Sequence, residues 1–394
     1  MNINKKYIIT IIVTALITCL ITNTVNDYNF IKNNGKTIKK LSSVLDVIED
    51  YSIYGIENKD EMADLASAAF VYSLNDKYAL YISKDQYKNY LSAVSSSYFG
   101  IGAKLQSDLI TNEVTIAECD KGMPADIGGV LPGDILLAVD EEECTAQNLS
   151  LITNYIKNKG EGSEVSLKLK RDGKVIYKTL TVMRIVSDTV SGEMLTDDIG
   201  YIKITDFRGD IDKEVRTTVD DFKDNFNTLR DNGMTKIIVD LRDNPGGEFG
   251  TVATIIDEFL SEGLITYTED KNGKKSHLYA TSGGYDYPVC ILVNENTASA
   301  AEIFTAALHD NGKATVIGTK TYGKGLVQKN LPLYDGSALL LTVSKYFTPS
   351  GVCINEIGIE PDIHLELPEG MSPSDFTLNK DPQVLKAIEV LNKQ

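Results

Sequence analysis

Histidine and cysteine are scarce in this sequence. Its 394 residues include three histidines and five cysteines. The cysteines are odd in number and widely spaced, and no C-x-x-C pair or Cys/His cluster occurs among them. They are Cys19, Cys119, Cys144, Cys290 and Cys353. This spacing argues against a structural zinc site and a disulfide framework. We therefore expect buried free thiols, no metal and no cofactor.

Basic residues are also fewer than acidic ones. Lys and Arg number 39 against 56 Asp and Glu, which gives a formal net charge of -17. This balance argues against nucleic acid or an anionic membrane surface as a partner. The acidic residues are spread along the chain, and we interpret them as part of the solvated surface. With 42% hydrophobic and 24% charged residues, the chain can form two or three domains with sizeable cores.

A long apolar run occurs at the N-terminus, and we assign residues 1–26 as a membrane anchor or signal segment. Lys5 and Lys6 precede an uncharged stretch over 7–25. As a helix this stretch spans about 28 Å, close to the hydrocarbon thickness of a bilayer. No clean small-x-small cleavage site follows, so a retained anchor is favoured over a cleaved signal. Lipidation at Cys19 is a weaker alternative. The flanking lysines do not settle the orientation.

Ser299 lies where an apolar run meets a helical pattern. The run PVCILV over 288–293 predicts a buried strand, and ASAAEIFTAAL over 298–308 predicts a helix. A serine at a strand-to-helix turn is exposed and faces the positive end of the helix dipole. No histidine is placed to activate it, because His309 lies roughly 15 Å further down the same helix. The other histidines are His277 and His364.

Lys324 can serve as the base in place of a histidine. It lies in TYGKG, a glycine-flanked turn after the predicted strand 314–317. A free lysine has a pKa of about 10.4, so it must fall by roughly 3 units to deprotonate a serine near neutral pH. Burial supplies such a shift, whereas a nearby carboxylate opposes it. Gln328, four residues on, is neutral and can accept a hydrogen bond from the amine.

These two motifs, TASAAEI and TYGKGLVQ, resemble those of the carboxyl-terminal processing peptidases, also called tail-specific proteases. The resemblance implies a Ser/Lys dyad in which Ser299 is the nucleophile, Lys324 the base and Gln328 the orienting residue. The alternative for either residue alone is structural, with Ser299 capping a helix and Lys324 lying in a loop. Taken together, the motifs favour catalysis.

A third motif, LRDNPGG over 241–247, follows the predicted buried strand KIIVDL. A Pro-Gly-Gly turn at the end of a strand can direct backbone N–H groups at a ligand. By the same resemblance, Gly246 (or Gly247) and Ala300 are implied as the oxyanion-hole donors, each worth roughly 3 kcal/mol to the transition state. An ordinary turn is the alternative for this motif.

Residues 98–184 resemble a PDZ domain. Gly100, Ile101 and Gly102 form a loop whose glycines permit positive φ and whose N–H groups can bind an anion. An alternating hairpin with Asp172-Gly173 at its turn follows a helix over 146–159. PDZ domains bind a peptide C-terminus as an added strand. We expect this domain to select substrates, with Arg171 as a candidate for relaying its occupancy.

The resemblance implies a mixed α/β (α+β) multidomain fold with a crotonase/ClpP-like catalytic core and an inserted PDZ domain. The domains are the membrane segment 1–26, a helical region 27–97, the PDZ domain 98–184, the catalytic domain 185–370 and a helical segment 371–394. The terminal helices are expected to make homodimer contacts. The sequence departs from the family at Lys77, where proline is usual.

We therefore expect a membrane-anchored serine endopeptidase on the extracytoplasmic side, acting on proteins or peptides with free, apolar C-termini. Two alternatives are a non-catalytic PDZ scaffold and an enzyme of the crotonase-like fold acting on acyl thioesters. The joint presence of Ser299, Lys324 and Gln328 argues against the scaffold. The PDZ insertion argues against the thioester enzyme.

Overall fold

The computed structural model describes residues 34–94, 97–108, 110–186, 188–209, 216–281 and 283–394. The expected membrane segment, 1–26, lies outside these ranges. Within them, no helix combines the length and the apolar character that a bilayer crossing requires. The chain divides into two compact units, Met1–Phe70 and Val71–Gln394, which are described separately below.

The N-terminal unit is helical in its described part. One helix covers 34–51, and α2 (Lys59–Tyr72) begins in this unit. Ile38, Leu41, Val44 and Val47 recur along the first helix and are 43–57% exposed. This helix therefore presents an apolar face that the described chain leaves uncovered.

The second unit begins with β1 (Leu80–Ile82) and α3 (Lys84–Val94), then enters a small β domain through β2 (Ser97–Gly100) and leaves it through β9 (Met183–Val186). β2 and β9 pair antiparallel. Between them lies a sheet of order β3-β4-β5-β7-β8, with β6 paired to β5. Its elements are β3 (Ala103–Asp108), β4 (Glu113–Cys119), α4 (Pro124–Ile127), β5 (Ile135–Val139), β6 (Glu142–Glu143), α5 (Leu149–Asn158), β7 (Glu164–Arg171) and β8 (Lys174–Thr181).

The β7–β8 hairpin turns where the sequence predicts. Asp172 and Gly173 have φ of 49° and 77°, the two positive angles that a tight hairpin turn needs. Alternate residues of β7 (Val165, Leu167 and Leu169) are fully buried in the core of this domain. β3 lies at the edge of the sheet, with β4 as its neighbour.

A six-stranded sheet of order β10-β11-β12-β15-β16-β19 forms the centre of the larger domain. β10 runs antiparallel to β11, and the other neighbours are parallel. The strands are β10 (Val190–Met194), β11 (Ile199–Ile204), β12 (Lys236–Asp240), β15 (Val289–Val293), β16 (Ala314–Gly318) and β19 (Ile363–His364). The continuous apolar runs in β12 and β15 follow from burial on both faces.

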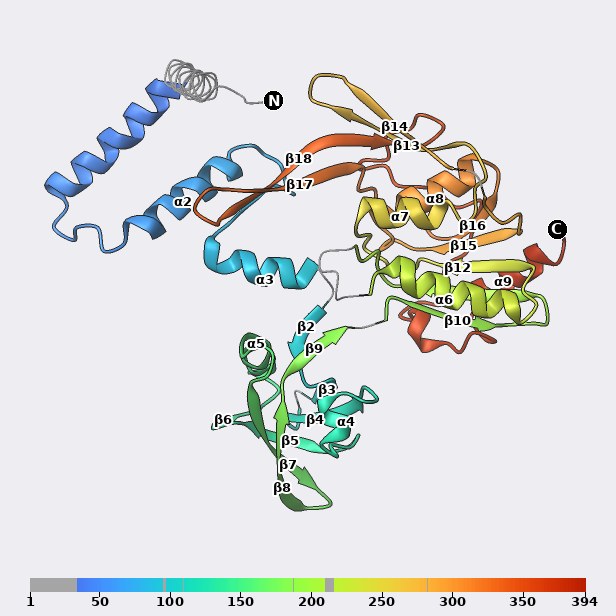
Figure 1. Cartoon of the computed structure of the whole chain (residues 1–394), viewed down its shortest axis with the longest axis horizontal. Coiled ribbons are helices and arrows are strands. Elements are labelled where there is room, and N and C mark those ends of the chain that lie inside the picture. The colour runs from blue at the N-terminus through green and yellow to red at the C-terminus, as the bar shows by residue number, and fades with distance from the viewer. Residues whose placement is uncertain (1–33, 95–96, 109, 187, 210–215, 282) are drawn as a thin grey trace, which may run out of the picture. The chain divides into compact units, whose positions relative to one another are not determined.

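Helices cover both faces of this sheet (Figure 1). One face packs against α6 (Thr218–Asp231), α7 (Phe249–Ile256) and α8 (Ala300–Asp310). The other face packs against α9 (Pro382–Leu391), which buries Val384, Ala387 and Leu391 completely. A short 3-10 helix, η1 (Pro373–Asp375), precedes α9. The apolar side of the C-terminal helix, which we expected to make dimer contacts, is thus buried within its own chain.

A buried ionic network ties α9 to the central sheet. Arg242, just after β12, donates to both oxygens of Asp240 and to Asp381 Oδ2 at 2.7 Å. Asp381 in turn caps α9, where its Oδ1 accepts from Val384 N and from Gln383 N. The Arg242, Asp240 and Asp381 side chains are at most 1% exposed. The segment after Arg242 is therefore anchored through the C-terminal helix.

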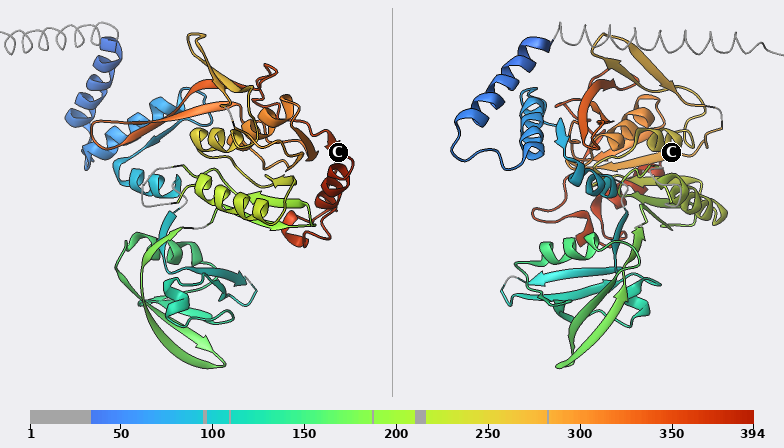
Figure 2. Two further views of the ribbon diagram at one scale, coloured as in Figure 1. Left: turned by 45° about the vertical axis from the view of Figure 1, so that its right-hand side comes forward. Right: turned by 60° about the vertical axis from the view of Figure 1, so that its left-hand side comes forward.

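A second sheet joins β1, β18, β13 and β14 in that order, with β17 also paired to β18. Its remaining strands are β13 (Leu264–Asp270), β14 (Lys275–Tyr279), β17 (Leu326–Pro332) and β18 (Ala338–Phe347). Figure 2 shows β17 and β18 as a long hairpin. β1 pairs antiparallel with β18, Leu80 opposite Leu340. This pairing brings the residues that immediately precede β1 close to β18.

Candidate active site

Ser299 lies at the predicted junction, between β15 and α8. Its φ of 56° and ψ of −116° are unusual for a residue other than glycine. Such a conformation costs about 1–3 kcal/mol and persists where neighbours hold it. Here the Ser299 N–H donates to Glu302 Oε2 at 2.8 Å, and the Tyr346 hydroxyl donates to the Ser299 carbonyl at 3.1 Å. The turn is fixed from both sides, and Ser299 lines the pocket described below.

Glu302 is the residue that joins the motifs carrying Ser299 and Lys324, and the sequence interpretation missed it. Its Oε1 accepts from Thr321 Oγ1 at 2.6 Å and from Gly323 N at 2.8 Å. Its Oε2 accepts from Ser299 N and from Lys324 N, both at 2.8 Å. The side chain is fully buried. One carboxylate thus fixes the backbone of both the serine and the lysine turns. The S-x-x-E spacing of a capping box was the available signal.

The ionisation of Glu302 and Lys324 is governed first by burial. Burial raises the pKa of Glu302, while its four hydrogen bonds oppose the shift. Burial also lowers the pKa of Lys324, and the Glu302 carboxylate opposes that shift. The sequence predicted a neutral partner for Lys324, Gln328, because a carboxylate opposes the lowering of the lysine pKa. The structure differs, because Glu302 is needed to hold the turn, yet the pKa of Lys324 still lies below its ordinary value.

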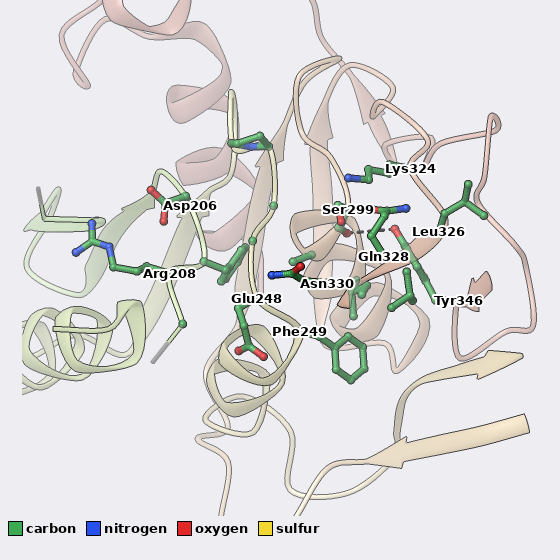
Figure 3. A pocket seen from close by; sticks show the side chains of 18 of the residues that line it. Asp206, Arg208, Glu248, Phe249, Ser299, Lys324, Leu326, Gln328, Asn330 and Tyr346 are labelled. Atoms are coloured by element: carbon green, nitrogen blue, oxygen red, sulfur yellow. Dashed lines mark hydrogen bonds between the residues drawn. The ribbon is translucent and has the colours of Figure 1, made fainter. Parts of the chain in front are cut away.

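The Lys324 side chain enters the same pocket as Ser299 (Figure 3). Its Nζ lies 4.9 Å from the centre of the Tyr78 ring. Among the described residues, no hydrogen bond joins Lys324 Nζ to Ser299 Oγ. Gln328, on β17, lines the pocket as well, but its Nε2 donates to Thr342 Oγ1 at 3.4 Å. The three predicted residues are therefore brought together, while the bonds of a working dyad are not formed.

The Pro-Gly-Gly turn lies directly against Ser299. A Cβ added to Gly246 would meet Ser299 Cβ at 2.8 Å and Ala300 N at 2.9 Å. However, the Gly246 N–H, which we predicted as a donor, donates to Asn244 Oδ1 at 2.8 Å. In the described part of the chain, no acceptor bonds the N–H of Gly247 or of Ala300. The alternative donor, Gly247, thus fits this conformation better than Gly246.

The pocket has a volume of about 590 Å³ and is lined by both apolar and polar side chains. The apolar lining residues are Phe249, Ala300, Ile303, Leu326, Val327, Leu340 and Tyr346. The polar lining residues include Asp206, Arg208 and Glu248 (Figure 3). No group of three or more His, Cys, Asp or Glu side chains suited to a metal ion occurs among the described residues.

Comparison with known proteins identifies the family. "Carboxy-terminal processing protease CtpA" of Bacillus subtilis (strain 168) is 35% identical over 335 residues, which cover 84% of this chain and 69% of the relative. "Probable CtpA-like serine protease" of Staphylococcus aureus (strain MRSA252) is 31% identical over 396 residues, with 97% and 76% covered. The family model for peptidase family S41 matches residues 198–365, and that for a PDZ domain matches 97–182. The chain belongs to peptidase family S41.

Solved structures show the same fold. A photosystem II D1 C-terminal processing protease aligns with a TM-score of 0.51 and 23% identity, covering 84% of this chain and 88% of that one. A putative S41 protease from Bacteroides fragilis NCTC 9343 aligns at 0.56 and 18%, covering 83% and 90%. This S41 peptidase is thus a serine-type, C-terminal processing protease with a PDZ domain and a mixed α/β fold. The crotonase/ClpP-like classification of its core stays a prediction.

The loop over 100–102 in the PDZ domain of this S41 peptidase adopts a conformation that requires glycine at Gly102. Gly102 has a φ of 68°, and a Cβ there would lie 2.3 Å from Met123 Cβ. The loop carbonyl of Ile101 already accepts a hydrogen bond, from Ala125 N at 2.8 Å. No acceptor among the described residues bonds the N–H of Ile101 or Gly102. Gly100 ends β2, and β3 starts immediately after the loop with its outer edge unpaired in the described sheet.

Arg171 has a role in packing within the PDZ domain. Its guanidinium donates to both oxygens of Asp134 at 2.6 Å and to the Gly129 carbonyl at 2.9 Å. Asp134 is 1% exposed, and the Arg171 hydrogen bond lowers its pKa. These contacts fix the end of the β7–β8 hairpin. They give no direct link to the peptidase site, so the relay of occupancy through Arg171 stays a prediction.

Proposed function

We propose that this S41 peptidase is a membrane-anchored serine endopeptidase that recognises protein C-termini through its PDZ domain and cleaves by a Ser/Lys acyl-enzyme mechanism. One observation carries the mechanism. Ser299 and Lys324 line one pocket, their turns are held by the same buried Glu302, and burial lowers the pKa of Lys324. A serine held in a strained turn beside a partly buried amine is suited to nucleophilic catalysis.

The proton follows a closed path in this mechanism. Neutral Lys324 Nζ accepts the proton of the Ser299 hydroxyl as Oγ attacks the scissile carbonyl. The carbonyl electrons move to oxygen, and the resulting anion is held by the N–H groups of Ala300 and Gly247. Lys324 returns the proton to the leaving amine as the C–N bond breaks. Water then attacks the acyl-enzyme while Lys324 accepts a proton from it. The ester C–O bond breaks, the new C-terminal carboxylate leaves, and Lys324 returns that proton to Ser299 Oγ.

The conformation described here is a resting one under this proposal. Gln328 donates to Thr342, so it must change partner before it can orient Lys324. The Gly246 N–H remains bonded to Asn244 Oδ1, so Gly247 supplies the oxyanion donor of this turn. The change at Gln328 requires a side-chain rotation within the pocket wall. Occupancy of the PDZ domain is the proposed trigger.

The C-terminus of the substrate is proposed to bind along β3. The unpaired outer edge of this strand offers backbone groups for an added peptide strand, and the adjacent N–H groups of Ile101 and Gly102 suit a carboxylate. An amidated C-terminus would lose the charge that these N–H groups attract. If amidation leaves cleavage of a substrate unchanged, selection by the C-terminus is wrong.

Location and assembly complete the proposal. The uncharged stretch 7–25 supports a single-pass anchor, and the proposed extracytoplasmic location rests on the family resemblance alone. The exposed apolar face of helix 34–51 supports a homodimer formed by the N-terminal region. Light scattering of residues 27–394 beside a variant with Leu41 and Val44 both replaced by Asp would test the dimer.

The decisive experiment is cleavage of an unstructured protein with an apolar C-terminus by residues 27–394. Ser299→Ala and Lys324→Ala are run beside the parent, each with and without a chelator. Activity in the parent that both substitutions abolish and the chelator spares supports the Ser/Lys mechanism. Equal activity in all three proteins overturns it. Activity that is lost in Ser299→Ala but kept in Lys324→Ala assigns the base to another residue.

A further inference from the structure

The segment before β1 reaches the catalytic lysine. Because β1 pairs with β18, residues 76–79 lie beside the turn that carries Lys324. Within this segment Asp76 Oδ1 accepts the Tyr78 N–H at 3.0 Å. Burial raises the pKa of Asp76, but hydrogen bonds from Thr342 and from Tyr78 outweigh it and lower the pKa. Thr342 also accepts from Gln328, so the segment is joined to the pocket wall.

Tyr78 presents its ring, not its hydroxyl, to the site. Lys324 Nζ lies 4.9 Å from the ring centre, within the range at which an ammonium is attracted to an aromatic face. The Tyr78 hydroxyl is buried and has no hydrogen-bond partner among the described residues. A buried hydroxyl without a partner is costly. What this position contributes at the site is therefore the aromatic face.

We propose that Tyr78 is a positioning residue for the catalytic base, whose ring binds the ammonium form of Lys324 and so sets its position and its proton affinity. The inference rests on the proposed role of Lys324 as the base. Among the described residues, Glu302 is the one charged group found to act on the pKa of Lys324. The ring adds a second, uncharged attraction that holds the amine in the pocket without a further carboxylate.

The other ionisable groups near this contact do not account for the effect proposed for the Tyr78 ring on Lys324. The buried groups are Glu302 and Tyr346, and the groups near Tyr78 are Lys77 and Tyr322. Lys77 Nζ lies 5.1 Å from the Tyr78 ring centre, but its side chain is 57% exposed and pairs with Glu356. Solvent therefore screens most of its influence on Lys324.

The test measures the pKa of Lys324 without relying on proteolysis. Full-length protein carrying Ser299→Ala is treated with acetic anhydride across a range of pH, and acetylation of Lys324 is followed by mass spectrometry of its peptide. The rate rises with the neutral fraction of the amine. Tyr78→Leu removes the aromatic face, whereas Tyr78→Phe keeps it.

The proposal expects the pKa of Lys324 to fall by about half a unit to one unit in Tyr78→Leu, since a partly desolvated cation–π contact is lost. Tyr78→Phe should match the parent. An unchanged or raised pKa in Tyr78→Leu, or the same shift in both variants, overturns it. If circular dichroism shows that Tyr78→Leu does not fold, the pKa of Lys324 is measured in Tyr78→Met instead and judged by the same criterion. Acetylation of Lys324 can be measured even in a protein without protease activity. Failure of this proposal can therefore be distinguished from failure of the proposed function.

Discussion

The Glu302 carboxylate binds the backbone of Lys324 while it opposes the loss of that lysine's charge. The Lys324 N–H donates to Glu302 Oε2 at 2.8 Å, and Glu302 raises the pKa that burial lowers. The same oxygen accepts from Ser299 N. Under the proposed mechanism, the carboxylate that fixes the positions of Ser299 and Lys324 thus also works against the lowered pKa that Lys324 needs as a base.

Substitution Glu302→Gln should disrupt both turns. The two oxygens of Glu302 face four donors, and an amide NH2 in place of one oxygen leaves two donors unpaired. Each unsatisfied buried donor costs about 1–3 kcal/mol. We therefore expect a lower free energy of unfolding in urea and a large loss of proteolysis. The exposed Glu295→Gln, whose carboxylate accepts from Thr319, is the matched control and should change stability by less than about 0.5 kcal/mol.

Lys324→Met should abolish activity and yet stabilise the protein at neutral pH. The pKa of Lys324 in the folded protein is lowered from 10.5. Between the lowered value and 10.5, the unfolded chain binds the proton more tightly, so the parent gains stability as pH rises. The advantage of Lys324→Met should therefore be greatest near neutral pH and shrink toward about pH 10. Urea unfolding at several pH values checks this. A constant difference would contradict it.

The central elements of this fold are predictable from local sequence. The runs in β12 and β15 are apolar because both faces of a parallel sheet are covered, and Asp172-Gly173 is a two-residue turn that few other pairs allow. The boundaries of α7 are harder to predict from the sequence. This helix spans Phe249–Ile256, and its start depends on the Glu248 side chain, which accepts from Thr251 N as a cap.

Contacts between distant segments explain what the sequence interpretation missed. Ser299 and Lys324 could be found because each lies in a recognisable motif. Glu302 is one helical turn from Ser299, but its role depends on donors at 321–324. Tyr78 reaches Lys324 only through the pairing of β1 with β18. No local periodicity encodes such a pairing, so these partners emerge only from the folded chain.

Removal of Asp381 should affect the active site from a distance. Asp381 is 1% exposed and accepts from Arg242, which lies two residues before Asn244 in the oxyanion turn. Breaking a buried ion pair from one side costs about 3–5 kcal/mol. Asp381→Ala should lower the unfolding free energy by that amount and reduce kcat more than it changes KM. Asp375→Ala, in the exposed η1 turn, is the control. Equal effects of the two substitutions would count against the anchoring role.

His309 should make stability depend on pH near neutrality. Burial lowers its pKa, but hydrogen bonds with Asp310 and Asp362, both at 3.1 Å, outweigh burial and raise the pKa above 6.5. The stabilisation from a raised pKa is complete below the unfolded value and is lost as pH rises through the folded value. His309→Gln should therefore cost more stability at about pH 5.5 than at about pH 9. Urea midpoints at the two pH values measure this, and an equal loss at both would refute it.

Gly102→Ala should abolish recognition of a peptide C-terminus. The added Cβ would lie 2.3 Å from Met123 Cβ, so the loop that presents the Ile101 and Gly102 N–H groups must shift. Gly122→Ala is a matched control, because Gly122 also has positive φ, at 79°, but has no atom within 4 Å of an added Cβ. Both variants carry the backbone strain of a positive φ, and only Gly102→Ala carries the clash.

Fluorescence anisotropy with a labelled peptide that ends in a free apolar residue measures the difference. The parent and Gly122→Ala should bind this peptide and discriminate against its amidated form. Gly102→Ala should bind at least about tenfold more weakly, a change of roughly 1.4 kcal/mol, and should no longer distinguish the two peptides. Because strain is common to both variants, a selective loss in Gly102→Ala assigns recognition to the loop itself. Undiminished discrimination in Gly102→Ala would place the C-terminus elsewhere on the domain.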